Sequence, residues 1–106
     1  MKYNVRIGAL AREEIDRRYG VDRGPAGRPS RRDFERGPLA AATLRFEQFD
    51  TLAEAVGPAI RQCHVLDPGF APIVFVGVLI EADLVEIASC DEDPDYWDLI
   101  EDDPRF

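Results

Sequence analysis

The run at residues 73–80, IVFVGVLI, constrains the fold of this chain more than any other segment. It is apolar apart from one glycine and mostly β-branched, which favours a central strand that is covered on both faces of a sheet. Glu81-Ala82-Asp83 then turns the chain, and residues 84–90 are expected to pair back as the second strand of a hairpin. The run is far shorter than the roughly 20 residues of a membrane-spanning helix. We therefore expect a sheet built around this hairpin and no membrane partner.

Other periodic segments predict the remaining elements. Residues 2–7 alternate and predict a half-buried strand, and apolar residues spaced by four over 9–19 predict an amphipathic helix that ends at Gly20. Residues 40–49 alternate again and predict a strand. Thr51 and Glu54 fit a capping box, which predicts a helix over 51–63 that kinks at Pro58 or begins there. A last short helix is expected over residues 95–102.

These elements have the order β-α-loop-β-α-β-β-α in a chain of 106 residues, a length typical of one domain. The expected fold class is α+β, with a small mixed or antiparallel sheet of about four strands and helices packed on one face. Residues 1–106 are expected to form a single domain. Cys63 and Cys90 show no metal-binding or redox spacing and no secretion signal precedes them, so we expect buried free thiols in a cytoplasmic protein.

Charge is distributed unevenly along the chain. Residues 1–37 carry 10 basic and 6 acidic side chains, a balance of +4, and residues 38–106 carry 3 basic and 15 acidic side chains, a balance of −12. Together these give the net charge of −8. Such asymmetry bears on binding partners and not on the fold.

Residues 91–106 form an acidic C-terminal segment that also carries large apolar side chains. Of the 14 residues at 91–104, 8 are acidic and none is basic. On a helix, the aromatic residues would share a stripe with Ile100, suited either to docking on the chain's own sheet or to a partner's groove. Acids alternate at 91, 93 and 95, but Pro94 and the lack of a following glycine argue against a calcium loop, so a solvated acidic loop without a metal is expected. The residues expected to bind a partner are Asp91, Glu92, Asp93, Asp95, Tyr96, Trp97, Asp98, Ile100, Glu101 and Asp102.

Residues 21–38 are rich in arginine, glycine and proline and predict a long flexible loop. A guanidinium group can bind phosphate oxygens in bidentate fashion, and the candidates for this role are Arg28, Arg31, Arg32 and Arg36. Two alternatives are a GC-rich genome, which favours arginine codons, and pairing of these arginines with acids of the same chain. Nucleic acid is not the expected partner, because the chain as a whole is acidic.

Residues that could form a catalytic centre are few. His64, the only histidine, adjoins Cys63, but neighbours on a helix point about 100° apart and cannot form a thiol–imidazole pair by adjacency alone. His64 is instead expected at the surface, at a helix end. The chain has no zinc-ligand spacing, no phosphate-binding glycine loop and no nucleophile elbow. We therefore expect no cofactor, and the sequence favours a non-enzymatic protein over an enzyme.

The opening segment, Tyr3-Asn4-Val5-Arg6-Ile7 followed by residues 9–15, resembles that of ParE-type toxins, as does the hairpin that ends in Val85-Glu86-Ile87. The acidic charge and the lack of a second long helix depart from that family's pattern, so no function is carried over.

The leading hypothesis is a small acidic non-enzymatic interaction protein. It would act as a regulator, inhibitor or adaptor that binds a basic site on a partner protein, including as a mimic of nucleic acid. One alternative is a small toxin-like or phosphate-handling enzyme that uses the arginine-rich loop. The other is a structural homo-oligomer built through the apolar edge of the hairpin.

Overall fold

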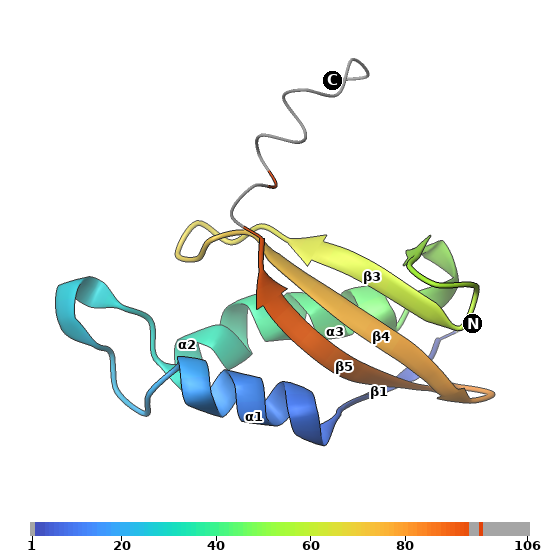
Figure 1. The fold of residues 1–106 in the computed structure, drawn as a ribbon, viewed down its shortest axis with the longest axis horizontal. Coiled ribbons are helices and arrows are strands. Elements are labelled where there is room, and N and C mark those ends of the chain that lie inside the picture. The colour runs from blue at the N-terminus through green and yellow to red at the C-terminus, as the bar shows by residue number, and fades with distance from the viewer. Residues whose placement is uncertain (1, 94–95, 97–106) are drawn as a thin grey trace, which may run out of the picture.

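The computed structural model describes residues 2–93 and Tyr96. Its centre is a mixed five-stranded sheet with the strand order β1-β5-β4-β3-β2, which confirms the expected α+β class (Figure 1). β1 runs parallel to β5, and the other neighbouring strands are antiparallel. The strands are β1 (Asn4–Ile7), β2 (Ala53–Glu54), β3 (Ile60–Val65), β4 (Ile73–Glu81) and β5 (Leu84–Glu92).

We call the helices of the chain the helical layer: α1 (Ala9–Arg18), the 3-10 turn η1 (Pro25–Gly27), α2 (Arg31–Phe34), the π-turn η2 (Glu35–Leu39), α3 (Ala40–Phe46) and the 3-10 turn η3 (Phe49–Thr51). The helices α1 and α3 bury Ile15 and Phe46 in one core with Phe75 and Ile87 of the sheet, so they lie on the same side of it. In Figure 1, α3 is behind β4 and β5, α1 is below them, and the segment that contains η1 extends beyond the sheet. Because α2, η2 and α3 follow one another directly, they form one helical run over residues 31–46. The π-turn contains Pro38, which lacks the N–H needed for a regular helical hydrogen bond.

Three segments predicted from local patterns fold as expected. The alternation at residues 2–7 gives β1, the period of four over 9–19 gives α1, and residues 73–90 form the β4–β5 hairpin. The apolar positions of the first helix, Ala11 and Ile15, are both buried, as is Tyr19 directly after it. In these segments one periodicity was present without a competing pattern, so the local signal was sufficient.

Residues 40–49, predicted as a strand, are helical, and the predicted loop at 21–38 is partly helical. The buried residues Phe34, Pro38, Ala42 and Phe46 recur every fourth position, which is the spacing of one helix face. The prediction failed because the alternation of apolar and polar residues around Phe46 was given more weight than this longer period. Glycine and proline at 37–38 were interpreted as loop residues, whereas they occupy the π-turn inside the helical run.

The helix predicted over 51–63 is also wrong, because this segment forms β2, a turn and β3. The hydroxyl of Thr51 donates to the carbonyl of Gln48 and does not cap a helix. Gly57, with φ of 72°, lies in the turn between the strands, where glycine adopts the left-handed conformation at no steric cost. Consequently His64 lies in β3 and not at a helix end.

The β4–β5 hairpin occupies the middle of the sheet, so β4 pairs with β3 and β5 pairs with β1. β3 pairs with Ile73–Val78 of β4, and β1 pairs with Leu84–Ile87 of β5, so both edges of the hairpin are paired along part of their length. The alternative of a homo-oligomer through the hairpin edge stays a prediction. β5 also continues through Asp91 and Glu92, where the sequence predicted its end. The described residues contain no helix that is long and apolar enough to span a membrane.

The core lies between the sheet and the helical layer. Phe34, Phe46 and Phe75 are fully buried there, together with Ile15 of α1 and Ile87 of β5. β4 was expected to be covered on both faces, but in the described part of the chain the helices cover only one. The physical reason is topological: within the described residues, all helices belong to the single connection between β1 and β2, and this connection packs on one side of the sheet.

Candidate functional site

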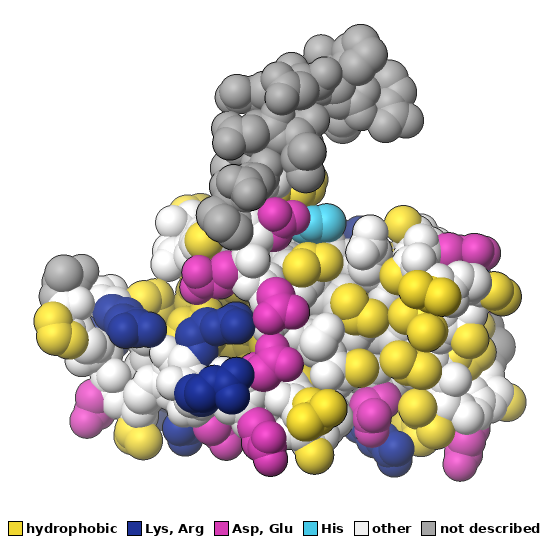
Figure 2. Space-filling model, viewed as in Figure 1, with side chains coloured by type: hydrophobic (Ala, Val, Ile, Leu, Met, Phe, Trp, Pro, Cys, Tyr) yellow, Lys and Arg dark blue, Asp and Glu magenta, His cyan; other side chains and the backbone are white. Residues whose placement is uncertain are grey.

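The side of the sheet that faces away from the helices carries apolar side chains in its centre. Strand pairing places Val78 beside Ile60 and Glu86, Val76 beside Gln62 and Ser89, and Val74 beside His64 and Asp91. Figure 2 shows hydrophobic side chains gathered over the sheet in this view. We call this surface the open face, and its residues are Ile60, Gln62, His64, Val74, Val76, Val78, Glu86, Ser89 and Asp91.

One end of the open face is formed by the last residues of β5, where several predicted partner-binding residues lie. Nη2 of Arg18 is 3.6 Å from Oδ1 of Asp91, and Nη1 of Arg18 donates to the carbonyl of Cys90 at 3.3 Å. Oδ2 of Asp93 lies 3.1 Å from Nε2 of His64. The ring of Tyr96 stacks on the imidazole of His64, with 4.5 Å between centroids.

The structure therefore brings four of the predicted partner-binding residues to this end of the sheet: Asp91, Glu92, Asp93 and Tyr96. Asp91 and Glu92 are exposed, and Asp93 is half-buried. The other six lie outside the described residues: Asp95, Trp97, Asp98, Ile100, Glu101 and Asp102. Sequence reasoning missed His64 as a member of this group, because it placed the residue on a helix. Strand alternation from Cys63 and Val65, both buried, would have put His64 on the opposite face.

The opposite end of the open face is the β4–β5 turn, which is also acidic. Glu81 and Asp83 are exposed there, and Asp83 accepts a hydrogen bond from the side chain of Asn4 at 3.2 Å. Between the two ends, Nε of Arg6 lies 3.0 Å from Oε1 of Glu86, so the charge in the middle is paired. The open face is thus apolar in the centre and negatively charged at both ends.

The four candidate phosphate-binding arginines lie in the helical layer or in the loop that leads to it. Nη2 of Arg28 donates to the backbone carbonyl of Arg18 at 3.2 Å. Nε of Arg31 lies 3.1 Å from Oδ1 of Asp16. Arg32 and Arg36 have no ion pair within the described residues, and both line an open depression of about 640 Å³. The other lining residues are Val21, Asp22, Arg31 and Glu35, so carboxylates offset most of the positive charge there.

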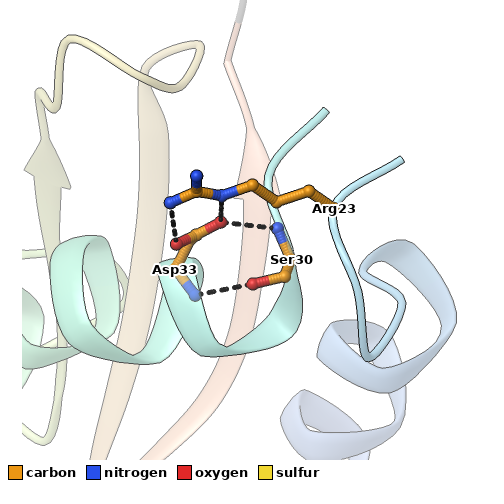
Figure 3. A network of polar contacts seen from close by, with 3 residues as sticks. All are labelled: Arg23, Ser30 and Asp33. Carbon is orange, nitrogen blue, oxygen red and sulfur yellow. Dashed lines mark hydrogen bonds and ion pairs between the residues drawn. The ribbon is translucent and has the colours of Figure 1, made fainter. Parts of the chain in front are cut away.

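A polar network at the start of α2 explains why part of the predicted loop is ordered (Figure 3). Nε and Nη2 of Arg23 donate to the two carboxylate oxygens of Asp33 at 2.9 and 3.1 Å. Ser30 and Asp33 form a reciprocal capping box at the helix N-terminus. These hydrogen bonds hold the pKa of Asp33 well below its usual range. Those from Arg23 have the largest effect, and the one from the backbone N–H of Ser30 has the next largest. The Ser-x-x-Asp spacing was the signal in the sequence that could have located this helix start.

The two cysteines are buried and free, as expected. Cys63 and Cys90 pair with the same residue, Phe75, from opposite sides. They are therefore two strand spacings apart, about 10 Å, which is too far for a disulfide. Burial raises the pKa of each thiol to about 11. Cys63 also faces the core while His64 lies on the open face, so the two do not form a catalytic pair.

The site thus consists of an apolar surface with acidic ends, an arrangement suited to binding a macromolecule. Within the described part of the chain, no group of His, Cys, Asp and Glu residues could hold a metal ion. No protein-family model, curated protein or solved structure matches this chain.

Proposed function

We propose that this chain is a small acidic, non-enzymatic interaction protein that binds a basic site on a partner protein. It acts as a regulator, inhibitor or adaptor, and the site it occupies can be one that otherwise binds phosphate groups. The observation that supports this most directly is the pair of acidic ends of the β4–β5 hairpin. Glu81, Asp83, Asp91 and Glu92 are all exposed there.

The strands carry more negative charge than the helical layer, although α3 and η3 come from the acidic residues 38–106 and β1 comes from the basic residues 1–37. The strands β2 to β5 all come from residues 38–106, which carry the balance of −12. β1, α1 and α2 come from residues 1–37, which carry +4. Counted over the elements themselves, the five strands carry five acidic and two basic side chains, a balance of −3, and the helical layer carries six acidic and seven basic side chains, a balance of +1. A basic partner is therefore attracted to the sheet first.

Internal ion pairs cancel only part of this charge. Arg18 contacts Asp91, but the carboxylate of Asp91 remains 62% exposed. No ion pair involves Glu81 or Glu92 in the part of the chain that the structure describes. Exposed pairs contribute only about 0–1 kcal/mol each, so even the paired acids can exchange their partner for a basic group of another protein.

The test begins with affinity capture of partners on the tagged chain and their identification by mass spectrometry. The dissociation constant of the purified partner is then measured at several salt concentrations, because binding between exposed charges weakens as salt screens them. The double variant Glu81→Gln/Glu92→Gln removes one charge from each acidic end. At about 0.5 kcal/mol per exposed charge, we expect roughly fivefold weaker binding.

A matched control removes two acids from residues 1–37. Glu13 and Asp22 are both exposed, so Glu13→Gln/Asp22→Asn changes the net charge equally without altering the sheet. We expect this control to bind nearly as well as the unchanged chain. Binding that does not weaken with added salt would contradict the proposal.

A second candidate is a small phosphate-handling enzyme, favoured by the depression that Arg32 and Arg36 line. Alanine substitution of both residues, assayed against RNA and nucleotide substrates, separates the two functions. Lost turnover with unchanged partner binding would favour the enzyme.

A further inference from the structure

The central strand β4 is apolar on both of its faces, although the helices cover only one. Phe75 faces the core and is fully buried, whereas Val74, Val76 and Val78 alternate onto the open face and are half-buried. Strands that are apolar on both faces are typical of sheets with a layer on each side. We infer that the open face is a docking surface for a partner protein that presents an apolar stripe with basic side chains at both ends. This inference rests on the proposed function and identifies where the partner binds.

The centre of the open face has the composition of an interface core. Val78 lies beside Ile60, and the next row holds Val76 with the uncharged Gln62 and Ser89. The two charged residues near this centre, Arg6 and Glu86, form an ion pair with each other, with 3.0 Å between Nε and Oε1. Depletion of charged side chains in the centre, with charges at the rim, is the usual arrangement of protein–protein interfaces.

The acidic ends specify the charge of the partner. Glu81 and Asp83 lie at one end of β4, and Asp91 and Asp93 lie at the other end of the open face. Glu92 pairs with the core-facing Ile73 and therefore lies on the other side of the sheet. A strand of nine residues spans roughly 25 Å. The partner's basic groups should therefore be about 25 Å apart, which corresponds to about 17 residues of a helix.

Charge and area both disfavour a second copy of this chain as the occupant. Because the open face is acidic at both ends, face-to-face stacking of two copies brings acids against acids in either orientation. Three strands about 4.8 Å apart, over the roughly 13 Å from Val74 to Val78, give a central patch of roughly 200 Å², about a quarter of what each partner buries in a stable interface. Basic groups that reach the acidic ends can supply the remaining contact, whereas a second acidic copy cannot.

The experiment uses three labelled 20-residue helical peptides as probes. The first has leucines along one face and three lysines at each end, the second replaces the leucines by glutamine, and the third replaces the lysines by glutamate. Binding is measured by fluorescence anisotropy, and the binding site is mapped from backbone amide NMR shifts. We expect the lysine–leucine peptide to bind at least tenfold more tightly than the other two. It should shift the amide signals of β3 and β4 and leave those of α1 unchanged.

Two sets of variants test the open face directly. Val74→Thr/Val76→Thr/Val78→Thr keeps β-branched side chains and hence strand propensity, but removes the apolar surface. Val76→Thr alone serves if the triple variant does not fold. The matched control is Leu10→Gln/Leu44→Gln, since these leucines are 70% and 66% exposed in the helical layer. We expect about tenfold weaker peptide binding for the triple variant and no change for the control.

Each contrary outcome is distinct. If the lysine–glutamine peptide binds as tightly as the lysine–leucine peptide, the docking inference fails and the preference for a basic partner stands. If the glutamate-ended peptide binds equally well, the proposed function fails and apolar docking stands. A dimer of the unliganded chain in sedimentation experiments that the triple variant abolishes would assign the open face to a second copy and overturn the inference.

Discussion

Gly77 of β4 is the position where the packing of the core can be tested most sharply, because the ring of Phe46 lies directly on it. A Cβ atom at residue 77 would lie 2.5 Å from Cε1 and 2.8 Å from Cδ1 of that ring. Carbon atoms in contact are about 3.5–4.0 Å apart, so the ring or the strand would have to move by about 1 Å. Phe46 is fully buried in a closely packed core and has no free space to move into. We therefore predict that Gly77→Ala destabilises the fold.

The expected size of the effect follows from two opposing contributions. Overpacking a core costs about 1–3 kcal/mol, whereas replacing glycine by alanine within a strand recovers about 0.5–1 kcal/mol. The net loss should be about 1–2 kcal/mol of the 5–15 kcal/mol that stabilises a typical domain. A change of 1 kcal/mol shifts Tm by about 4–8 °C in a domain of about this size, so we expect Tm to fall by about 5–15 °C.

A double-mutant cycle, measured by urea unfolding, tests whether the contact with the ring of Phe46 causes the destabilisation by Gly77→Ala. In a Phe46→Leu background the ring is absent, so Gly77→Ala should cost less than it does in the unchanged chain. Gly20→Ala is the control, because the nearest atom to its added Cβ is 3.6 Å away, and its effect should stay within about 0.5 kcal/mol. An unchanged midpoint for Gly77→Ala, or an equal cost in both backgrounds, would refute the explanation by overpacking.

Three further predictions concern groups outside this contact. The pKa of Asp33 is lowered in the folded state, so its stabilising contribution is present above the unfolded value of about 4 and is lost as pH falls from there towards the folded value. Urea midpoints of Asp33→Asn and the unchanged chain should therefore differ at pH 7 and converge below pH 4; a constant gap would contradict this. Because burial raises the pKa of the Cys63 and Cys90 thiols to about 11, Ellman's reagent at pH 8 should label them only after unfolding, and immediate labelling of the native protein would argue against it. Finally, Arg32→Ala/Arg36→Ala should change the free energy of unfolding by less than about 0.5 kcal/mol, since neither residue has an ion pair in the described region; a larger loss in urea unfolding would reveal a structural role.

Local patterns predicted the segments in which one periodicity stands alone. The alternation of β1 and the four-residue spacing of α1 determine which side chains face the core, and both segments folded as expected. The apolar run of β4 predicted a strand, which formed, but it is covered by helices on only one face. The long helical run at 31–46 was missed because alternation around Phe46 and the Gly37-Pro38 pair suggested other structures. Burial of Phe46 against Gly77, which is distant in sequence, favours the helix, and a local window contains neither that contact nor its energy.

The candidate site likewise has features that the sequence predicts and features that depend on the fold. The acidity of residues 91–93 could be read directly from the sequence, whereas the contact of Asp93 with His64 joins two different strands and depends on the pairing of β3 with β4. Likewise, the arginines of 21–38 could be named, but not which of them are held by Asp16 or Asp33.

The sequence by itself determined that β4 is apolar on both sides and that negative charge gathers in residues 38–106, because both are properties of residue order alone. Only the tertiary structure decided that the helices of residues 2–93 pack on the same side of the sheet and that β1 inserts beside β5. These choices depend on contacts between residues up to 80 positions apart, such as Arg6 with Glu86. For this reason the apolar surface with two acidic ends, on which the proposed binding depends, became visible only in the folded chain.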